Sequence, residues 1–148
     1  MKIVVDEQGL TLIEAAVVLT IISILFLLPT ITFQSYEEKI EIDLFIEEVR
    51  NNVTLMQNHA VFNGQATEIQ VQDENNAIEF FVQGQPNHPL NRTVTPPETI
   101  TVLTSNRYRF RAYSGNIGRL GRARFQAPDG VYEFVFQLGS GRFYVQKV

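Results

Sequence analysis

The stretch Gln8-Gly9-Leu10-Thr11-Leu12-Ile13-Glu14 stands directly before a long apolar run that ends near Phe33. Glu14 is the one charged residue between positions 10 and 33. A carboxylate within a membrane-spanning segment costs about 2.5–3.5 kcal/mol at mid-bilayer on insertion scales, so by default it marks a functional position. As a helix rising 1.5 Å per residue, residues 10–33 would be about 36 Å long, which is enough to cross a bilayer.

A secretory signal peptide is the first alternative for this run. The apolar region of such a peptide extends over about 7–15 residues and ends at small residues of the Ala-x-Ala type. The run over residues 10–33 is longer, and no such cleavage site follows it. The sequence therefore predicts a transmembrane or filament-core helix over residues 10–33. Pro29 removes one intrahelical hydrogen bond within it, and we expect a kink there.

The residues from Gly9 to Glu14 resemble the class III signal of type IV prepilins and pseudopilins, which reads Gly, an apolar residue, then Thr-Leu-Ile-Glu. The resemblance implies that residues 1–9 are a prepilin leader, that prepilin peptidase cuts after Gly9, and that the new terminal residue, Leu10, is N-methylated. The leader carries Asp6 and Glu7, whereas leaders of this family are usually more basic. The alternative is that Gly9 merely breaks the chain ahead of a helix.

Glu14 is predicted to act in filament assembly. After cleavage, the α-ammonium group of Leu10 would lie at nearly the same depth as this carboxylate. A neighbouring subunit shifted along the filament axis can bring its own Leu10 ammonium group to Glu14, which would recover part of the cost of burial and set the register between subunits. The alternative is that Glu14 snorkels to the membrane interface.

Residues 34–63 continue the helical pattern as an amphipathic segment that ends at Asn63-Gly64. Apolar residues recur there at spacings of three to five, and acidic residues occupy the other faces. An unbroken helix over residues 10–63 would be about 80 Å long. The expected buried face comprises Tyr36, Ile40, Leu44, Val49, Val53, Met56 and Ala60.

From residue 64 onward the apolar period changes to two, which predicts strands. We expect strands over 67–71, 77–82, 99–103, 107–113, 122–127, 131–138 and 142–147, with a long proline-rich loop over 84–97. One long helix followed by a run of strands predicts an α+β, pilin-like fold, in which the helix packs on a C-terminal antiparallel β-sheet over residues 64–148. The aromatic residues expected in its core are Phe110, Phe125, Phe134, Phe136 and Phe143.

Charge is distributed unevenly along the chain, although the net charge is only −4. Acidic residues dominate residues 34–63, and arginines dominate from residue 107 onward. Arg107, Arg109 and Arg111 alternate along one expected strand and so share a face, as do Arg122 and Arg124. These arginines are candidates for a basic contact face. The simplest interpretation is two solvated surfaces of opposite sign; the others are surfaces that meet between subunits, or a patch for a polyanion.

Direct contact with DNA is the less favoured interpretation of the arginines. Proteins that bind single strands place arginines and exposed aromatic side chains together. Here Tyr108 and Phe110 fall on the face opposite to the arginines, and only Tyr113 shares the arginine face. We therefore favour a solvated or subunit-facing basic surface.

Signals for an enzyme or a metal site are absent from the sequence. There is no cysteine, which excludes a disulfide, a thiol nucleophile and a thiolate metal site. His59 and His88 show no ligand spacing. Ser140 lacks the strand–turn–helix context of a nucleophile elbow. We expect no catalytic residue, no metal and no cofactor.

These features together indicate a minor pilin or pseudopilin. Residues 136–143 also resemble the last hairpin of ComGD-type minor pilins of Gram-positive competence machinery, which implies a role in the type IV pilus that takes up DNA during transformation. The family resemblance implies prepilin peptidase, major and minor pilin subunits and membrane lipid as partners. It also implies a single-pass membrane precursor that ends at the cell surface. The alternatives are a minor pseudopilin of a type II secretion system and a single-span receptor or adhesion module.

Overall fold

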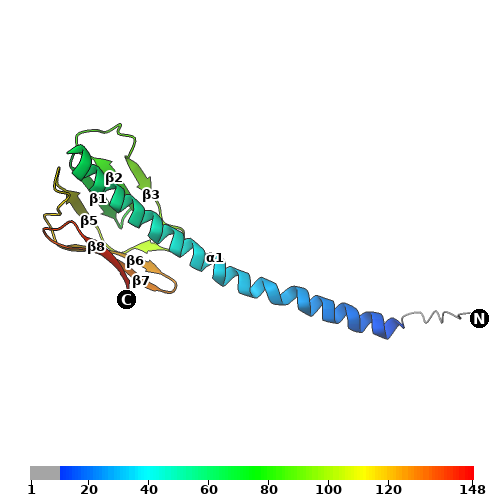
Figure 1. Ribbon diagram of the computed structural model, residues 1–148. Helices are drawn as coiled ribbons and strands as arrows, with labels where there is room; N and C mark the ends of the chain where they lie inside the picture. Colours follow the sequence, from blue (N-terminus) through cyan, green and yellow to red (C-terminus); the bar gives the residue numbers. More distant parts are fainter. Residues whose placement is uncertain (1–10) are drawn as a thin grey trace, which may run out of the picture. The chain divides into compact units, whose positions relative to one another are not determined.

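The computed structural model describes residues 11–148, except for the side chains of residues 27–35. The chain divides into two compact units, one up to Lys39 and one from Ile40 to Val148. One helix, α1 (Leu12–Asn63), precedes all the strands (Figure 1). Its helical backbone is unbroken at position 29, and the kink expected at Pro29 stays a prediction.

Eight strands follow the helix and form two antiparallel sheets of four strands each. Sheet A contains β1 (Thr67–Gln72), β2 (Ala77–Val82), β3 (Arg92–Val94) and β5 (Asn106–Phe110), in the order β3-β2-β1-β5. Sheet B contains β4 (Thr101–Val102), β6 (Gly121–Ala127), β7 (Gly130–Phe136) and β8 (Phe143–Lys147), in the order β4-β6-β7-β8. The predicted α+β class with a helix packed on antiparallel strands is confirmed. The single sheet that the sequence suggested is divided into two.

One expected loop and one expected strand end were wrong. The proline-rich loop over 84–97 contains β3, because the side chain of Asn91 fixes the loop next to β2. Its Oδ1 accepts a hydrogen bond from Val82 N at 2.8 Å, and its Nδ2 donates to the carbonyl oxygen of Gln85 at 2.7 Å. The strand expected to continue to Tyr113 ends at Phe110, and Tyr113 adopts a left-handed backbone with φ of 64°. Tyr113 therefore does not share a strand face with the arginines.

The core of the second unit lies between α1 and the two sheets (Figure 1). The ring of Phe45 on α1 packs edge-to-face on Phe125 of β6, with 5.5 Å between centroids. Thr67 Oγ1 at the start of β1 donates to the carbonyl oxygen of Met56 at 2.9 Å, which ties sheet A to the helix. Four of the five phenylalanines expected in the core are buried, and the fifth, Phe143, is partly buried against them.

The helix buries a different face from the one expected at its start. Val49, Val53, Met56 and Ala60 are buried as predicted, but Tyr36, Ile40 and Leu44 are exposed. Ile42, Phe45 and Ile46 take the buried positions instead. The set that starts at Ile42 keeps the spacings of three and four that follow the helical period, whereas steps of four alone drift around the helix.

Candidate functional site

The first turn of α1 is closed by a reciprocal pair of side chains. Glu14 Oε2 accepts hydrogen bonds from Thr11 N at 3.1 Å and from Thr11 Oγ1 at 2.9 Å. Glu14 N donates back to Thr11 Oγ1 at 3.4 Å. This is the arrangement of a capping box, in which a Thr at the N-cap and a Glu three residues later satisfy backbone donors of the first turn. Glu14 therefore stabilises the start of the helix, and it is also the one charged residue in the apolar stretch that the helix begins with.

The apolar side chains on both sides of Glu14 are exposed. Every side chain from Thr11 to Phe26 is exposed, and the large apolar ones among them are Leu12, Ile13, Val17, Val18, Leu19, Ile21, Ile22, Ile24, Leu25 and Phe26. Over the part of the chain that the structure describes, no helix is sufficiently long and apolar to cross a membrane. The span expected over residues 10–33 includes residues whose side chains lie outside that part. The expected processing residues, Gly9 and Leu10, also lie outside it.

The arginines expected to form one basic face lie on two different sheets. Arg107 and Arg109 are exposed on β5 of sheet A, and Arg111 follows just after the strand. Arg122 and Arg124 are on β6 of sheet B. Arg107 Nε lies 4.0 Å from Glu68 Oε1 on the neighbouring strand, a long contact between an exposed guanidinium group and a mostly buried carboxylate. The structure therefore provides two separate basic groups.

The group on sheet B is organised around one carboxylate. Glu133 on β7 lies 2.8 Å from Arg124 Nε and 3.3 Å from Arg122 Nη1, and its Oε2 accepts a hydrogen bond from Gln146 Nε2 of β8 at 2.9 Å. Arg124, Glu133 and Gln146 face one another directly across the three strands. The side chain of Glu133 is only 2% exposed, whereas those of Arg122 and Arg124 are 60% and 46% exposed. The carboxylate thus lies beneath the two guanidinium groups and holds them in place.

Hydrogen bonding and charge both act on Glu133. The hydrogen bond from Gln146 and the positive charges of Arg122 and Arg124 hold the pKa of this carboxyl group below its ordinary value of 4.5, against the opposing effect of desolvation. The group therefore remains ionised at neutral pH. Two guanidinium groups against one carboxylate leave one excess positive charge on this surface.

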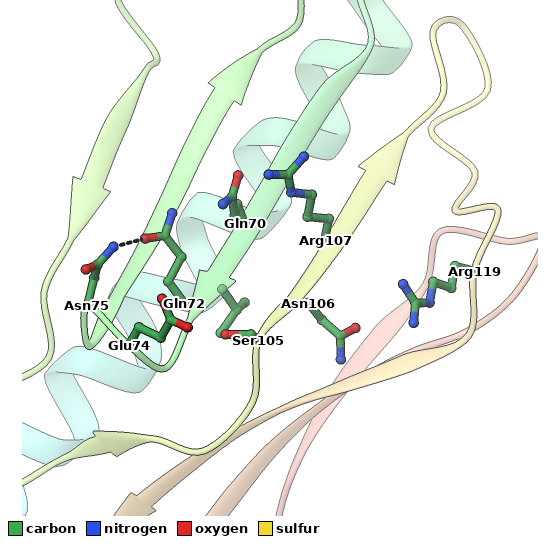
Figure 2. A pocket seen from close by; sticks show the side chains of 9 residues that line it. Gln70, Gln72, Glu74, Asn75, Ser105, Asn106, Arg107 and Arg119 are labelled. Carbon is green, nitrogen blue, oxygen red and sulfur yellow. Dashed lines mark hydrogen bonds between the residues drawn. The ribbon is translucent and has the colours of Figure 1, made fainter.

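An open groove of about 720 Å³ lies on sheet A beside the other arginines (Figure 2). Figure 2 shows Gln70 of β1 beside Arg107 of β5, its partner in the strand register. Gln72 turns toward Asn75, whose Nδ2 donates to it, and Arg119 lies beyond β5. The lining is dominated by amide and guanidinium groups, which donate hydrogen bonds but neither activate a nucleophile nor move a proton at neutral pH. Glu74 adds one carboxylate to this lining, and the groove is therefore suited to polar contact.

One close pair escaped the sequence reasoning entirely. The rings of His59 on α1 and His88 in the 84–91 loop lie 4.8 Å apart, in an edge-to-face arrangement. His59 Nε2 bonds to Gln65 Oε1 at 2.9 Å, and Leu90 N donates to His88 Nδ1 at 3.2 Å. The spacing in the sequence does not predict this contact, because the strands β1 and β2 separate the two residues along the chain. Within residues 11–148, no cluster of three or more His, Cys, Asp or Glu offers a metal site.

Comparisons with known proteins identify the fold. No protein-family model matches the sequence, and a comparison with characterised proteins finds no match at the sequence level. Among solved structures, the chain is similar to the type IV minor pilin FimU of Pseudomonas aeruginosa, with a TM-score of 0.57 and 17% identity over 75% of this chain and 92% of that one. It is also similar to the minor pseudopilin EpsH of the type 2 secretion system of Vibrio cholerae, with a TM-score of 0.57 and 13% identity over 72% of this chain and 97% of that one.

A second crystal form of FimU matches with a TM-score of 0.53 and 16% identity over 70% of this chain and 91% of that one. The matched proteins are aligned over nearly their whole length, so the likeness covers a complete domain and not one shared motif. The chain therefore has the fold of the minor pilins and minor pseudopilins.

Proposed function

We propose that this chain is a minor pilin or pseudopilin subunit that is built into a competence-type IV pilus and takes part in DNA uptake. The proposal is supported by three features that follow one another along the chain. A prepilin-like signal from Gly9 to Glu14 leads into an exposed apolar helix, and this helix is followed by a domain with the minor-pilin fold. Each part occurs elsewhere alone, but an assembled filament subunit needs all of them in this order.

The exposed apolar stretch from Leu12 to Phe26 requires a cover. Exposure of apolar surface to water costs about 25 cal/mol per Å². A helix with this many exposed apolar side chains is therefore more stable in lipid or packed against other apolar helices. In the proposed cycle, residues 1–9 are the leader, membrane lipid covers the helix of the precursor, and neighbouring pilin subunits cover it after prepilin peptidase has cut. The subunit thus moves from the cell membrane to the cell surface.

Glu14 has a role in each state of this cycle. Before cleavage its carboxylate is bonded to Thr11. After cleavage, a Leu10 ammonium group of a neighbouring subunit supplies an opposite charge to the same carboxylate. Exchange of a local hydrogen-bond partner for an ion pair between subunits offsets the cost of taking the charge into the filament core.

Processing and assembly are tested by two variants. Gly9→Val should leave a precursor that runs about 1 kDa heavier, the mass of a nine-residue leader at ~110 Da per residue, because the bulky side chain obstructs the protease cleft. Glu14→Ala should still insert into the membrane but enter sheared surface filaments poorly. Glu38→Ala, an exposed acid on the same helix, is the matched control and should assemble normally. A Gly9→Val product of mature size, or normal assembly of Glu14→Ala, would refute these roles.

The competence assignment rests on the β7–β8 hairpin, residues 136–143, which resembles that of competence minor pilins. A second candidate, a minor pseudopilin of a type II secretion system, is favoured by the similarity to EpsH. Deletion of the gene in its host distinguishes the two. Loss of transformation with normal protein secretion supports the competence pilus, and the reverse pattern supports the secretion system.

A further inference from the structure

The outer face of sheet B combines charge with exposed apolar side chains. Leu103, which follows β4, lies opposite Arg124, and Tyr144 of β8 lies in the same cross-strand row as Arg122. The residues Leu103 and Tyr144 are 44% and 45% exposed. We call Leu103, Arg122, Arg124 and Tyr144 the basic face. Glu133 holds both of its guanidinium groups from below.

The guanidinium groups of the basic face retain unused donors. Each carries five N–H donors. Among the residues that the structure describes, the recorded contacts join one nitrogen of each arginine to Glu133. An arginine held by one carboxylate and exposed on its other side is preorganised to bind a second carboxylate, because little side-chain entropy remains to be lost.

A surface of matching character lies on α1. Ile40 and Leu44 are 56% and 65% exposed. Glu41 and Glu48 are exposed on the same side of the helix, since positions 41, 44 and 48 are spaced by three and four. Neither carboxylate has a recorded ion pair within the described residues, in contrast to Glu47, which pairs with Arg50 at 2.8 Å. We call Ile40, Glu41, Leu44 and Glu48 the acidic ridge.

We propose that the basic face of one copy of this chain binds the acidic ridge of a second copy. The complementarity is double, because both surfaces place apolar side chains beside charges of opposite sign. Duplex DNA would neutralise Arg122 and Arg124 through its phosphates, which offer no apolar surface to Leu103 and Tyr144. An acidic helix with Ile40 and Leu44 covers them. The inference deepens the proposed function by naming one contact between subunits, and it rests on that function for its biological setting.

The contact joins two copies and cannot form within one. The inner face of β6 packs on α1 through Phe125 and Phe45, and strand alternation sends Arg122 and Arg124 to the opposite face. The ridge and the face of one copy therefore point to different neighbours. Such a heterologous contact leaves one free surface at each end, and its repetition gives an open, chain-like array.

Disulfide trapping in the full-length chain in detergent micelles tests the contact without touching the charges. The chain contains no cysteine, so every cross-link reports the introduced thiols. Leu44→Cys and Leu103→Cys are purified separately, mixed and oxidised, and we expect a dimer of twice the monomer mass of 16.9 kDa. Thr93→Cys, exposed on sheet A, is the matched partner control and should cross-link to Leu44→Cys only at the background rate.

The charges are then tested on the helix, where they support no recorded contact. Adding Glu41→Gln and Glu48→Gln to the Leu44→Cys chain should slow cross-linking about threefold to fivefold per charge removed, and high salt should do the same. Asp43→Asn, an exposed acid on another side of the helix, should leave the rate unchanged. The inference is overturned if Leu44→Cys cross-links to Thr93→Cys as fast as to Leu103→Cys, or if Glu41→Gln and Glu48→Gln leave the rate of cross-linking unchanged.

The outcome for the contact is separable from the outcome for the proposed function. Normal, charge-dependent cross-linking of a chain that never enters filaments in cells would leave the contact standing and refute the pilus role. Duplex DNA that suppresses the cross-link at micromolar concentration would show that the basic face prefers a polyanion, and would overturn the choice of partner.

Discussion

Gly141, in the turn between β7 and β8, is predicted to be the most sensitive glycine of the domain. Its φ is 65°, a conformation that L side chains rarely adopt. A Cβ at this position would lie 2.0 Å from the carbonyl oxygen of Gly115 and 2.6 Å from Nε2 of Gln57. The first neighbour is backbone, which cannot rotate away. Gly141→Ala therefore combines a strained backbone with a clash between two loops.

The magnitude follows from these two contributions. The left-handed conformation costs an alanine about 1 kcal/mol or somewhat more. Displacement of a packed backbone segment adds about 1–3 kcal/mol. We expect Gly141→Ala to lower the free energy of unfolding by about 3 kcal/mol, and Tm by roughly 12 °C at ~4 °C per kcal/mol.

Gly139 provides the matched control, two residues away in the same turn. Its φ is 80°, but no atom lies within 4 Å of its hypothetical Cβ. Gly139→Ala should therefore cost only the conformational contribution, about 1 kcal/mol. Thermal unfolding of the full-length chain in detergent, followed by near-ultraviolet circular dichroism of the tyrosines, measures both. Equal losses for the two variants would refute the clash and leave backbone strain as the whole effect.

Four further predictions follow from described contacts. Because the pKa of Glu133 is lowered in the folded state, this carboxylate stabilises the fold fully above pH 4.5, and the contribution is lost as the pH falls through the pKa of the folded state. Glu133→Gln should therefore flatten the acid side of the profile of Tm against pH. A profile parallel to that of the wild type would contradict this. The hydroxyl of Tyr108 is buried without a hydrogen-bond partner among the described residues, and burial raises the pKa of Tyr108 to about 12, so Tyr108→Phe should leave Tm unchanged or higher. Asn91→Ala should cost about 1–3 kcal/mol and release β3, seen as faster amide exchange at Val94, while exchange in sheet B stays slow. Replacement of Arg107, Arg109 and Arg111 by Ala should change DNA affinity little, because the chain should bind duplex or single-stranded DNA no more tightly than roughly 10⁻⁴–10⁻⁶ M at physiological salt; submicromolar binding that the triple variant abolishes would identify a DNA receptor.

Local patterns predicted much of the fold, because they depend on periods that the sequence displays directly. The change from helical spacing to alternation after Gly64 located both the end of α1 and the start of β1. Alternation along β6 and β7 also predicted the burial of Phe125, Phe134 and Phe136. These features are governed by short-range geometry and by the partition of apolar side chains from water.

The remaining features depend on contacts between distant residues. β3 exists because one asparagine, Asn91, bonds to a strand edge and a loop at once, and a count of prolines does not reveal that. The division of Arg107 from Arg122 depends on which sheet each strand joins. The exposure of Ile40 and Leu44 depends on which face of the helix the sheets cover, since Ile42 and Phe45 on another face are buried. In each case local chemistry was compatible with more than one arrangement, and packing selected among them.

The order of strands has a consequence for how the domain is made. The chain visits the sheets alternately: β3 belongs to sheet A, β4 to sheet B, β5 to sheet A and β6 to sheet B. β1 must therefore wait for β5, which lies beyond three intervening strands, before its second edge is filled. No cut between β3 and β6 leaves two fragments that each hold a whole sheet. Both sheets should form in one concerted and comparatively slow event, as expected for pairings of large sequence separation. For the same reason, a reporter inserted between these strands would lengthen a connection on which the closure of both sheets depends.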